Sequence, residues 1–260
     1  MPRKTARGTA GGTVPISVHA DDALMEAGGL IGQGVFPGPL RLVTVMSRSY
    51  HVARRAAALR LPRDRVPAVR RAEDRRFGRA CGLIPHNLGF PDRPVPSRRR
   101  LSALVDQICD RLVRTVGRLR PSLLVSPFPY GHTVHPHHLA VFRAAERAMT
   151  ILAGVELVLV DDVPYSRIPF GEEVILNGTK YVPLVLDLSR AGLAAKTRLM
   201  RRCYPSQMCP RYFRAVSRPT CGDRKARPGE SLWVPAHLKA AFADRLRDPA
   251  KPMDGEHIAA

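Results

Sequence analysis

The stretch TVPISVHADDALMEAGGLI, residues 13–31, decides the fold of this chain. Its first six residues are mostly apolar and predict a buried strand, and residues 23–31 predict a helix that Gly28 and Gly29 make pliable. A histidine and two adjacent aspartates stand between these two elements. The stretch therefore predicts a strand–helix unit of an α/β sheet, with polar side chains gathered where the strand ends.

The alternation of strands and helices continues along the chain. Apolar runs predict further strands at 40–45, 122–126, 155–160 and 182–188. Apolar residues at helical spacing predict helices at 101–119, 136–152 and 190–203. This order predicts a doubly wound, Rossmann-like and mostly parallel sheet with helices on both faces. Segments rich in Arg, Pro and Gly are expected to be surface loops, at 48–66, 84–100 and 210–230.

Length and composition limit the number of domains. A chain of 260 residues, 45% of them hydrophobic, can bury one sizeable core. We expect a basic, disordered N-terminus over 1–12 and one α/β domain over 13–209. The remaining segment, 210–260, is expected to be a C-terminal extension that packs on this domain or trails from it.

The charge of the chain is strongly positive. Lys and Arg number 42 against 22 Asp and Glu, which gives a formal net charge of +20. Such a charge indicates attraction to an anionic partner, although an excess of arginine spread along the whole chain is equally a matter of composition. Binding to nucleic acid is the alternative that charge alone raises. No recognition helix, zinc finger or aromatic–basic sheet motif supports it.

The sequence also bears on the location of the protein. No apolar run approaches the ~20 residues that a membrane span needs, and the apolar stretch near the N-terminus is shorter than a signal-peptide core. The five cysteines form no CxxC pair and indicate neither a disulfide framework nor a thiolate zinc site. We therefore expect a cytoplasmic protein without membrane association. The sequence is silent on whether it forms a homo-oligomer.

Two polar clusters are expected at the same edge of the sheet. His19, Asp21 and Asp22 follow the first strand, and the segment YGHTVHPHH, residues 130–138, follows the strand at 122–126. In open α/β sheets, ligands bind at the carboxyl ends of the strands. The proline at position 136 suits the first position of a helix, so that the histidines around it stand at a helix start.

The residue types in these clusters are suited to a divalent metal. His19, Asp22 and His138 offer two imidazoles and a carboxylate, the set that a catalytic zinc uses together with one open position. Asp21 is then left as a free carboxylate base and His135 as a hydrogen-bond donor. The alternatives are that the aspartates cap the helix that follows them, and that the histidines form a polar loop with incidental metal affinity.

The two clusters resemble a known pair of signatures. VHADD and HPHH are similar to the AHPDDE and HPDH motifs of the LmbE/PIG-L family of zinc-dependent N-acetylglucosaminyl deacetylases. Three further motifs follow the family in the right order, and the resemblance runs from about Val14 to Gln207. They are RRAEDRRFGRACGL at 70–83, LGFPD at 88–92 and KTRLMRRCYPSQ at 196–207.

The resemblance implies a role for each matching residue. It implies that His19, Asp22 and His138 hold one Zn²⁺ per chain, or another divalent ion. It implies that Asp21 is the general base and that His135 stabilises the tetrahedral intermediate. Residues implied or expected to contact the substrate are Arg70, Asp92, Tyr130 and His137.

Departures from the signatures matter as well. The glutamate of the first signature is Ala23 here, which removes a carboxylate that could orient a metal ligand. The aspartate of the second signature is His137, which should lower the proton affinity of His135. The family often has a tyrosine where Thr133 stands, and Tyr130 is its expected substitute. These changes keep open a weakened or inactive member that serves as an interaction module.

The expected function follows from the motifs and the charge. We expect an amidohydrolase that releases acetate from an N-acetylglucosamine-type sugar in specialised metabolite biosynthesis. A neutral sugar has no use for a charge of +20, so the sugar is expected to be attached to an anionic group, a nucleotide or an acidic carrier protein.

Overall fold

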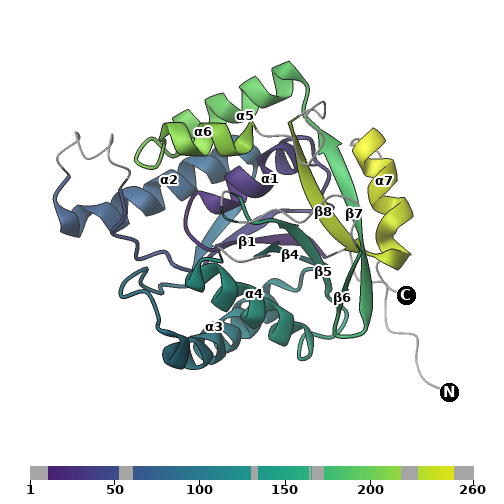
Figure 1. Cartoon of the computed structure of the whole chain (residues 1–260), viewed down its shortest axis with the longest axis horizontal. Coiled ribbons are helices and arrows are strands. Elements are labelled where there is room, and N and C mark those ends of the chain that lie inside the picture. Colours follow the sequence, from purple (N-terminus) through teal and green to yellow (C-terminus); the bar gives the residue numbers. More distant parts are fainter. Residues whose placement is uncertain are drawn as a thin grey trace.

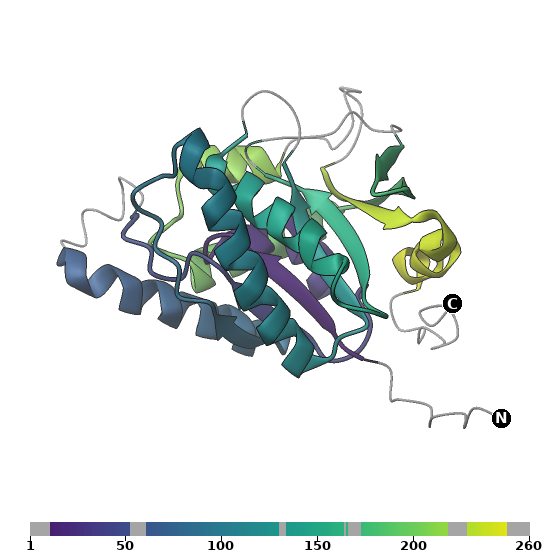
Figure 2. The same cartoon turned by 90° about the horizontal axis from the view of Figure 1, so that it is seen from below.

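The protein is one mixed β-sheet flanked by helices, as a computed structural model shows (Figures 1 and 2). The structure describes residues 11–52, 61–129, 134–163, 165, 173–217 and 228–248. Of the N-terminus expected at 1–12, residues 1–10 lie outside these ranges. No helix in the described ranges is both long enough and apolar enough to span a bilayer.

The eight described strands form a single sheet in the order β3-β2-β1-β4-β5-β8-β7-β6. The five strands from β3 to β5 run parallel, whereas β8 is antiparallel to both β5 and β7, and β6 is antiparallel to β7. The prediction of a doubly wound, mostly parallel sheet is therefore confirmed. The strands are β1 (Thr13–Ser17), β2 (Arg41–Thr44), β3 (Ile84–Asn87), β4 (Leu123–Phe128), β5 (Glu156–Asp161), β6 (Val174–Leu176), β7 (Thr179–Asp187) and β8 (Gly229–Pro235).

Helices cover both faces of the sheet (Figure 1). Helices α1, α2, α5 and α6 lie on one face and α3 and α4 on the other, while α7 packs beside β7 and β8. The helices are α1 (Asp22–Gly32), α2 (Val66–Cys81), α3 (Arg98–Leu119), α4 (Pro136–Met149), α5 (Arg190–Cys203), α6 (Pro210–Val216) and α7 (Lys239–Arg247). Short 3₁₀ turns precede α2 and α7, at η2 (Arg63–Arg65) and η3 (Ala236–Leu238).

The core is divided between the two faces by the alternation of side chains along each strand. In β4, Leu123 and Val125 pack in the cluster on the α1 side, and Leu124 between them packs in the cluster on the α3 and α4 side. Parallel central strands are apolar on both faces because helices cover both. For this reason the apolar runs in the sequence correctly predict the strands β1, β4 and β5.

All three expected loops contain regular structure. The 3₁₀ turn η2 lies in 48–66, β3 and the first residues of α3 lie in 84–100, and α6 lies in 210–230, so the prediction of loops there was wrong. β3 is an edge strand that pairs only with β2, and its Ile84 is 56% exposed. An edge strand needs no apolar run, which removes the signal that the central strands carry.

The segment expected as a C-terminal extension contributes to the same sheet. Its strand β8 lies between β5 and β7 and is buried along nearly its whole length. An antiparallel unit of β8, β7 and β6 thus extends the sheet beside the parallel strands. The carboxyl ends of β1, β4 and β5 remain together at one edge, and the polar clusters lie there.

Candidate metal centre

The turn between β1 and α1 presents carboxylates instead of capping the helix with them. Asp21 occupies the N-cap position of α1 but its side chain accepts no capping hydrogen bond. The hydroxyl of Ser17 accepts the backbone N–H of Ala23 at 3.0 Å in its place. Asp22 Oδ2 accepts the backbone N–H of His19 at 2.7 Å. The alternative interpretation of the two aspartates as helix caps is therefore wrong.

The turn between β4 and α4 orients the histidines. Pro136 takes the first helical position, as predicted, and His135 is the N-cap. The Nδ1 atom of His135 accepts the backbone N–H of His137 at 3.3 Å. This satisfies one of the free N–H groups at the helix start, and it directs His138 inward, where its side chain is fully buried.

Three donors from the two turns converge on one point. Each of His19, Asp22 and His138 offers a ligand atom, and these atoms all lie within 4.8 Å of one another. Asp22 Oδ2 lies 3.2 Å from His19 Nδ1 and 3.5 Å from His138 Nε2. The set of two imidazoles and one carboxylate fits zinc or a similar divalent ion.

The protonation of Asp22 suits a metal ligand. Burial by itself would raise the pKa of this carboxyl. The facing His138 and the hydrogen bonds from His19 outweigh burial and lower the pKa to about 2. Asp22 is therefore an anion at neutral pH, as a ligand must be.

Two buried carboxyl groups stand behind His138. Asp162 Oδ1 lies 2.7 Å from His138 Nδ1, and both side chains are fully buried. Glu26 also offers an atom within 4.8 Å of His138 and Asp162. Burial, together with the negative charges of Asp22 and Asp162, raises the pKa of Glu26 well above its usual value.

Sequence reasoning missed both of these groups. The signature glutamate is indeed absent at position 23, but Glu26 lies one helical turn later and Asp162 comes from the end of β5. A signal for Asp162 was present: VELVLVDD repeats the pattern of a buried strand followed by two aspartates. A metal-bound histidine usually donates its second N–H to a carboxylate, which fixes the orientation of the ring.

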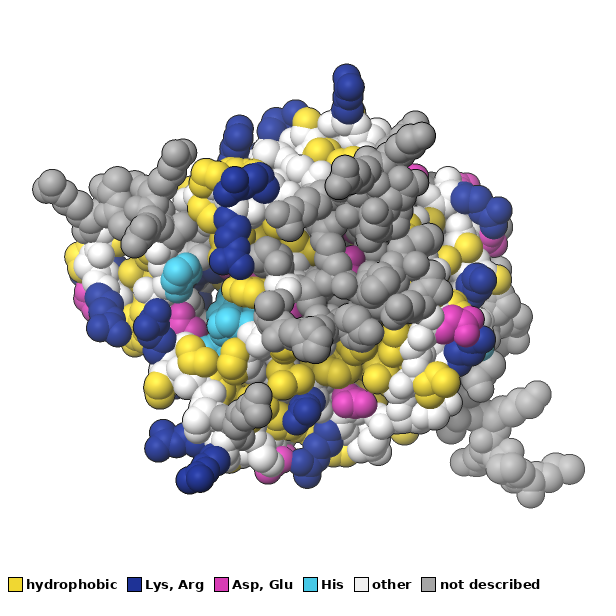
Figure 3. All heavy atoms as spheres, viewed as in Figure 1, with side chains coloured by type: hydrophobic (Ala, Val, Ile, Leu, Met, Phe, Trp, Pro, Cys, Tyr) yellow, Lys and Arg dark blue, Asp and Glu magenta, His cyan; other side chains and the backbone are white. Residues whose placement is uncertain are grey.

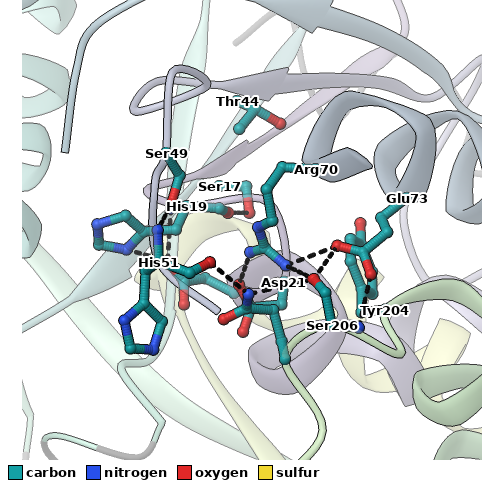
Figure 4. A network of polar contacts seen from close by, with 12 residues as sticks. Ser17, His19, Asp21, Thr44, Ser49, His51, Arg70, Glu73, Tyr204 and Ser206 are labelled. Atoms are coloured by element: carbon teal, nitrogen blue, oxygen red, sulfur yellow. Dashed lines mark hydrogen bonds and ion pairs between the residues drawn. The ribbon is translucent and has the colours of Figure 1, made fainter. Parts of the chain in front are cut away.

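A buried ion-pair network holds Asp21 (Figure 4). Arg70 of α2 contacts Asp21 Oδ1 through one guanidinium nitrogen and Glu73 Oε2 at 2.8 Å through another. The hydroxyl of Ser206 donates to Glu73 at 2.7 Å. Two of the quoted motif segments, 70–83 and 196–207, therefore contact each other through Glu73 and Ser206. Together they hold the Arg70 guanidinium beside Asp21. Arg70 lines the pocket wall with only 1% of its surface exposed.

Asp92 lies in the same pocket, on the segment between β3 and α3. Its carboxylate accepts the hydroxyl of Ser49 at 2.6 Å and the backbone N–H of Tyr50 at 3.1 Å. These bonds hold the side chain in one orientation, in a residue that is 6% exposed.

His135 and His137, the two other histidines at the start of α4, are neutral at physiological pH. Burial, then the nearby His138 and His19, lower the pKa of His135 to about 4. Burial, then His19, lower the pKa of His137 to about 3. The direction for His135 agrees with the sequence-based expectation, although burial is the largest cause. His137 Nδ1 lies 3.3 Å from His19 Nε2, so His137 contacts one of the three candidate metal donors as well as lining the pocket.

A tyrosine that sequence reasoning missed covers the histidines. The ring centroid of Tyr165 lies 4.8 Å from that of His138 and 5.4 Å from that of His135. Tyr130, the expected substitute for the family tyrosine, lies outside the described residues. Tyr165 follows β5, so the same sheet edge supplies it.

Most of the candidate site residues surround one cavity of about 160 Å³, while the fully buried His138 lies behind its wall. Its wall includes seven of the sequence-predicted residues: His19, Asp21, Asp22, Arg70, Asp92, His135 and His137. On the face of the molecule shown in Figure 3, histidine side chains are exposed next to hydrophobic side chains, and Lys and Arg side chains lie around them.

Comparison with known proteins agrees with this geometry. The family model of the GlcNAc-PI de-N-acetylases (PIG-L) matches residues 14–149, which is more than half of the chain. The chain belongs to this family. The resemblance read from the motifs is thereby confirmed. No curated protein sequence matches the chain.

Several solved structures share the PIG-L-type fold seen here. The A40926 pseudoaglycone deacetylase Dbv21 is 21% identical with a TM-score of 0.64, and the match covers 87% of this chain and 97% of that one. The zinc-inhibited form of teicoplanin deacetylase Orf2 is 20% identical with a TM-score of 0.65, covering 85% of this chain and 96% of that one. GalB, a 4-carboxy-2-hydroxymuconate hydratase from Pseudomonas putida KT2440, is 16% identical with a TM-score of 0.50, covering 85% and 95%. Such likenesses establish the fold, and the reaction has to be argued from the site.

Proposed function

We propose that the chain is a metal-dependent deacetylase that hydrolyses the acetamide of an N-acetylglucosamine-type sugar, with one zinc ion per chain. One observation carries the proposal: His19, Asp22 and His138 bring their donor atoms within 4.8 Å of one another. Asp21 and His135 line the same cavity as His19 and Asp22. Membership in the PIG-L family supplies the reaction class.

The metal and the base have separate roles. A divalent ion held by the three donors would act as a Lewis acid toward the amide carbonyl and make water a stronger acid. Asp21 takes the proton from the attacking water. Its ion pair with Arg70 uses Oδ1, which leaves Oδ2 as the oxygen that accepts the proton. Arg70 therefore orients the base, while its place in the pocket wall lets it reach a sugar hydroxyl as well.

His135 stabilises the developing negative charge as a neutral donor. Because its Nδ1 accepts the backbone N–H of His137, the neutral ring carries its proton on Nε2. With its pKa lowered to about 4, the ring stays in this form at neutral pH. An uncharged imidazole that donates one hydrogen bond to an oxyanion is an established catalytic device. Removing one such donor typically costs ~10²–10³ in rate.

The sugar is bound by the remaining polar groups of the pocket. Asp92 is oriented by Ser49 and Tyr50 and can accept sugar hydroxyls with its remaining lone pairs. His137 and Arg93 line the same wall. We keep Tyr130 as a further contact from the segment before His135.

The geometry favours an enzyme over an inactive interaction module. The module was considered because the signature glutamate is missing at position 23. The contact of 2.7 Å between Asp162 and His138 provides a carboxylate for the metal ligand by another route.

The basic charge and the structural relatives indicate the kind of substrate. Arg93 lines the pocket, and the chain carries a net charge of +20. We propose that the sugar is linked to an anionic group, a nucleotide or an acidic carrier protein. Two similar structures are deacetylases of A40926 pseudoaglycone and of teicoplanin biosynthesis, which supports a place in specialised metabolism.

The test uses the zinc-loaded protein and a panel of N-acetylglucosaminides that differ in aglycone, with free amine and acetate measured by mass. We expect release of acetate and one zinc per chain. Asp22→Ala should lose the zinc, whereas His135→Ala should keep it and lose ~10²–10³ in rate. Protein that binds no zinc, or zinc-loaded protein that cleaves no member of the panel, would refute the proposal.

A further inference from the structure

A second cavity lies directly beside the metal pocket. It has a volume of about 560 Å³ and runs between the segment 90–97 and the first turns of α3. We call it the α3 groove. Its lining is largely apolar, and the residues that define it are Phe90, Pro91, Pro94, Val95, Pro96 and Leu104.

The groove adjoins the metal pocket. Val95 and His137 line both cavities, so that a ligand can pass from one to the other along these two side chains. Val95 is 49% exposed, which is a large fraction for an apolar residue beside a catalytic pocket. An exposed apolar surface with polar surroundings marks a binding site for an apolar group.

The volumes of the two cavities suit different parts of one substrate. Ligand pockets usually measure about 300–1,000 Å³. At about 160 Å³ the metal pocket falls short of this range and holds only part of a larger ligand. The α3 groove, at about 560 Å³, lies within the range.

We propose that the α3 groove binds an apolar, ring-containing part of the aglycone attached to the amino sugar, while the anionic part of the substrate lies outside the groove. The inference rests on the proposed function in one respect: the amide must lie at His19, Asp22 and His138. Asp92 lines the metal pocket, and Pro91 and Val95 on the same segment line the groove. A sugar that binds Asp92 can therefore place its substituent in the groove, toward Val95. The acyl group, on the other side of the amide, stays in the metal pocket.

The chemistry of the groove suits such an aglycone. Three prolines and Phe90 present rigid apolar surface, which binds a ring system with little loss of side-chain entropy. Arg100 and Gln107 are its polar groups at the helix side, and no acidic residue lines it. A hydrated, highly polar sugar chain would leave this apolar wall unused.

The experiment compares three ligands by direct binding to the metal-free protein, which performs no turnover. These are methyl, naphthyl and cyclohexyl N-acetyl-β-glucosaminide, with dissociation constants measured by calorimetry. We expect the two ring aglycones to bind at least tenfold more tightly than the methyl compound. Ala103→Trp fills the groove and should reduce this advantage to less than threefold, with binding of the methyl compound unchanged. Ser102→Trp, one position earlier on α3 and outside the groove lining, is the matched control and should keep the advantage.

Each outcome decides the matter. Equal affinity for methyl and ring aglycones overturns the inference, as does an advantage that Ala103→Trp leaves intact while the circular dichroism of the variant is native. Tighter binding of methyl N-octanoyl-glucosaminide that Ala103→Trp abolishes, without a gain from ring aglycones, assigns the groove to the acyl chain and also overturns it. Tight, groove-dependent binding without acetate release from the zinc-loaded protein keeps the groove and refutes the proposed function instead.

Discussion

His138 Nδ1 lies 2.7 Å from Asp162 Oδ1, and neither side chain is exposed to solvent. The other ring nitrogen, Nε2, faces Asp22. The contact therefore places a carboxylate on the side of the ring that lies away from the metal site. A carboxylate in this position favours the tautomer of His138 that carries its proton on Nδ1 and helps to orient the ring.

Replacement of Asp162 should weaken metal binding without removing a ligand. We expect Asp162→Asn to lower zinc affinity ~10–100-fold, because the ring loses the anion that orients it and increases its basicity. Competition with a chromophoric chelator measures the affinity. Asp187→Asn, an exposed aspartate at the end of β7, is the control. A variant with wild-type affinity would mean that Asp162 serves packing alone.

Glu26 should behave as a neutral group. Burial and the neighbouring carboxylates raise its pKa well above the usual value, which favours the protonated, uncharged form. Glu26→Gln has nearly the same shape and no charge, and we expect the free energy of unfolding to change by less than about 1 kcal/mol. Urea denaturation at pH 7 checks this. A loss of several kcal/mol would show that an ionised Glu26 is needed there.

The three metal donors were predictable because each stands in a local pattern. His19 and Asp22 follow a clear apolar strand, and His138 follows a proline at a helix start, so strand–helix topology brings them to one edge. The role of Asp162 was harder to predict. It depends on the pairing of β5 with β4, and no local sequence pattern indicates that pairing. Glu26 lies outside the signature motif. Its relation to the site is seen only in the structure, where it is buried close to His138 and Asp162.

Parts of the fold escaped prediction for a related reason. The central strands are apolar because both of their faces are covered. β3 lies at the edge and lacks such a run, and β8 enters the sheet from the far end of the sequence. Its position between β5 and β7 depends on contacts more than 40 residues away in sequence.

Arg70 should matter for stability as well as for rate. Its removal leaves Asp21 buried without its cation and Glu73 with only the longer ion pair to Arg76 at 3.8 Å, and breaking a buried ion pair from one side costs ~3–5 kcal/mol. We expect Arg70→Ala to lower the free energy of unfolding by about this amount and to reduce kcat. Arg75→Ala, an exposed arginine on the same helix, should cost less than about 0.5 kcal/mol. If Arg70→Ala is as stable as Arg75→Ala, the network does not hold Asp21.

The histidines of the metal-free protein should titrate in separate ranges. Because the pKa of His135 is lowered to about 4 and that of His137 to about 3, both remain neutral until the pH falls well below 5. The pKa of His138 moves the other way, since Asp162 and Asp22 outweigh its burial and raise it. Histidine side-chain NMR across pH 3–8 measures all three.

The consequence for stability follows from the sign of these shifts. A histidine that stays neutral when folded takes up protons only when unfolded, once the pH falls below its ordinary value of ~6.5. His135 and His137 therefore make the metal-free protein less stable as the pH falls from about 6.5 toward 4. The variant His135→Gln/His137→Gln should lose less stability over this interval. An equal loss in both proteins would contradict the assignment.

The last prediction concerns the break in α1, the helix that begins with Asp22. At Ala27 the backbone leaves the helical conformation, with φ −135° and ψ 18°. Glu230 of β8 accepts the N–H groups of Gly29 and Leu30 at 2.6 and 2.8 Å. Lys196 Nζ lies 2.5 Å from Glu230 Oε1 and donates to the carbonyl of Met25 at 2.6 Å. One buried ion pair thus satisfies both sides of the break.

Glu230→Ala should cost ~3–5 kcal/mol, because it leaves Lys196 buried and unpaired. Replacing both partners, as Lys196→Met/Glu230→Leu, removes the unpaired charge. It still leaves two backbone N–H groups without an acceptor, and each such buried group costs ~1–3 kcal/mol. We therefore expect the double variant to recover only part of the loss, with a favourable coupling energy in the double-mutant cycle. Glu173→Ala is the control, since its ion pair with Lys180 is 53% exposed on both sides and should be worth less than about 1 kcal/mol. Full recovery in the double variant would show that water or a shifted helix satisfies the break, and that Glu230 is not what positions α1 and its Asp22.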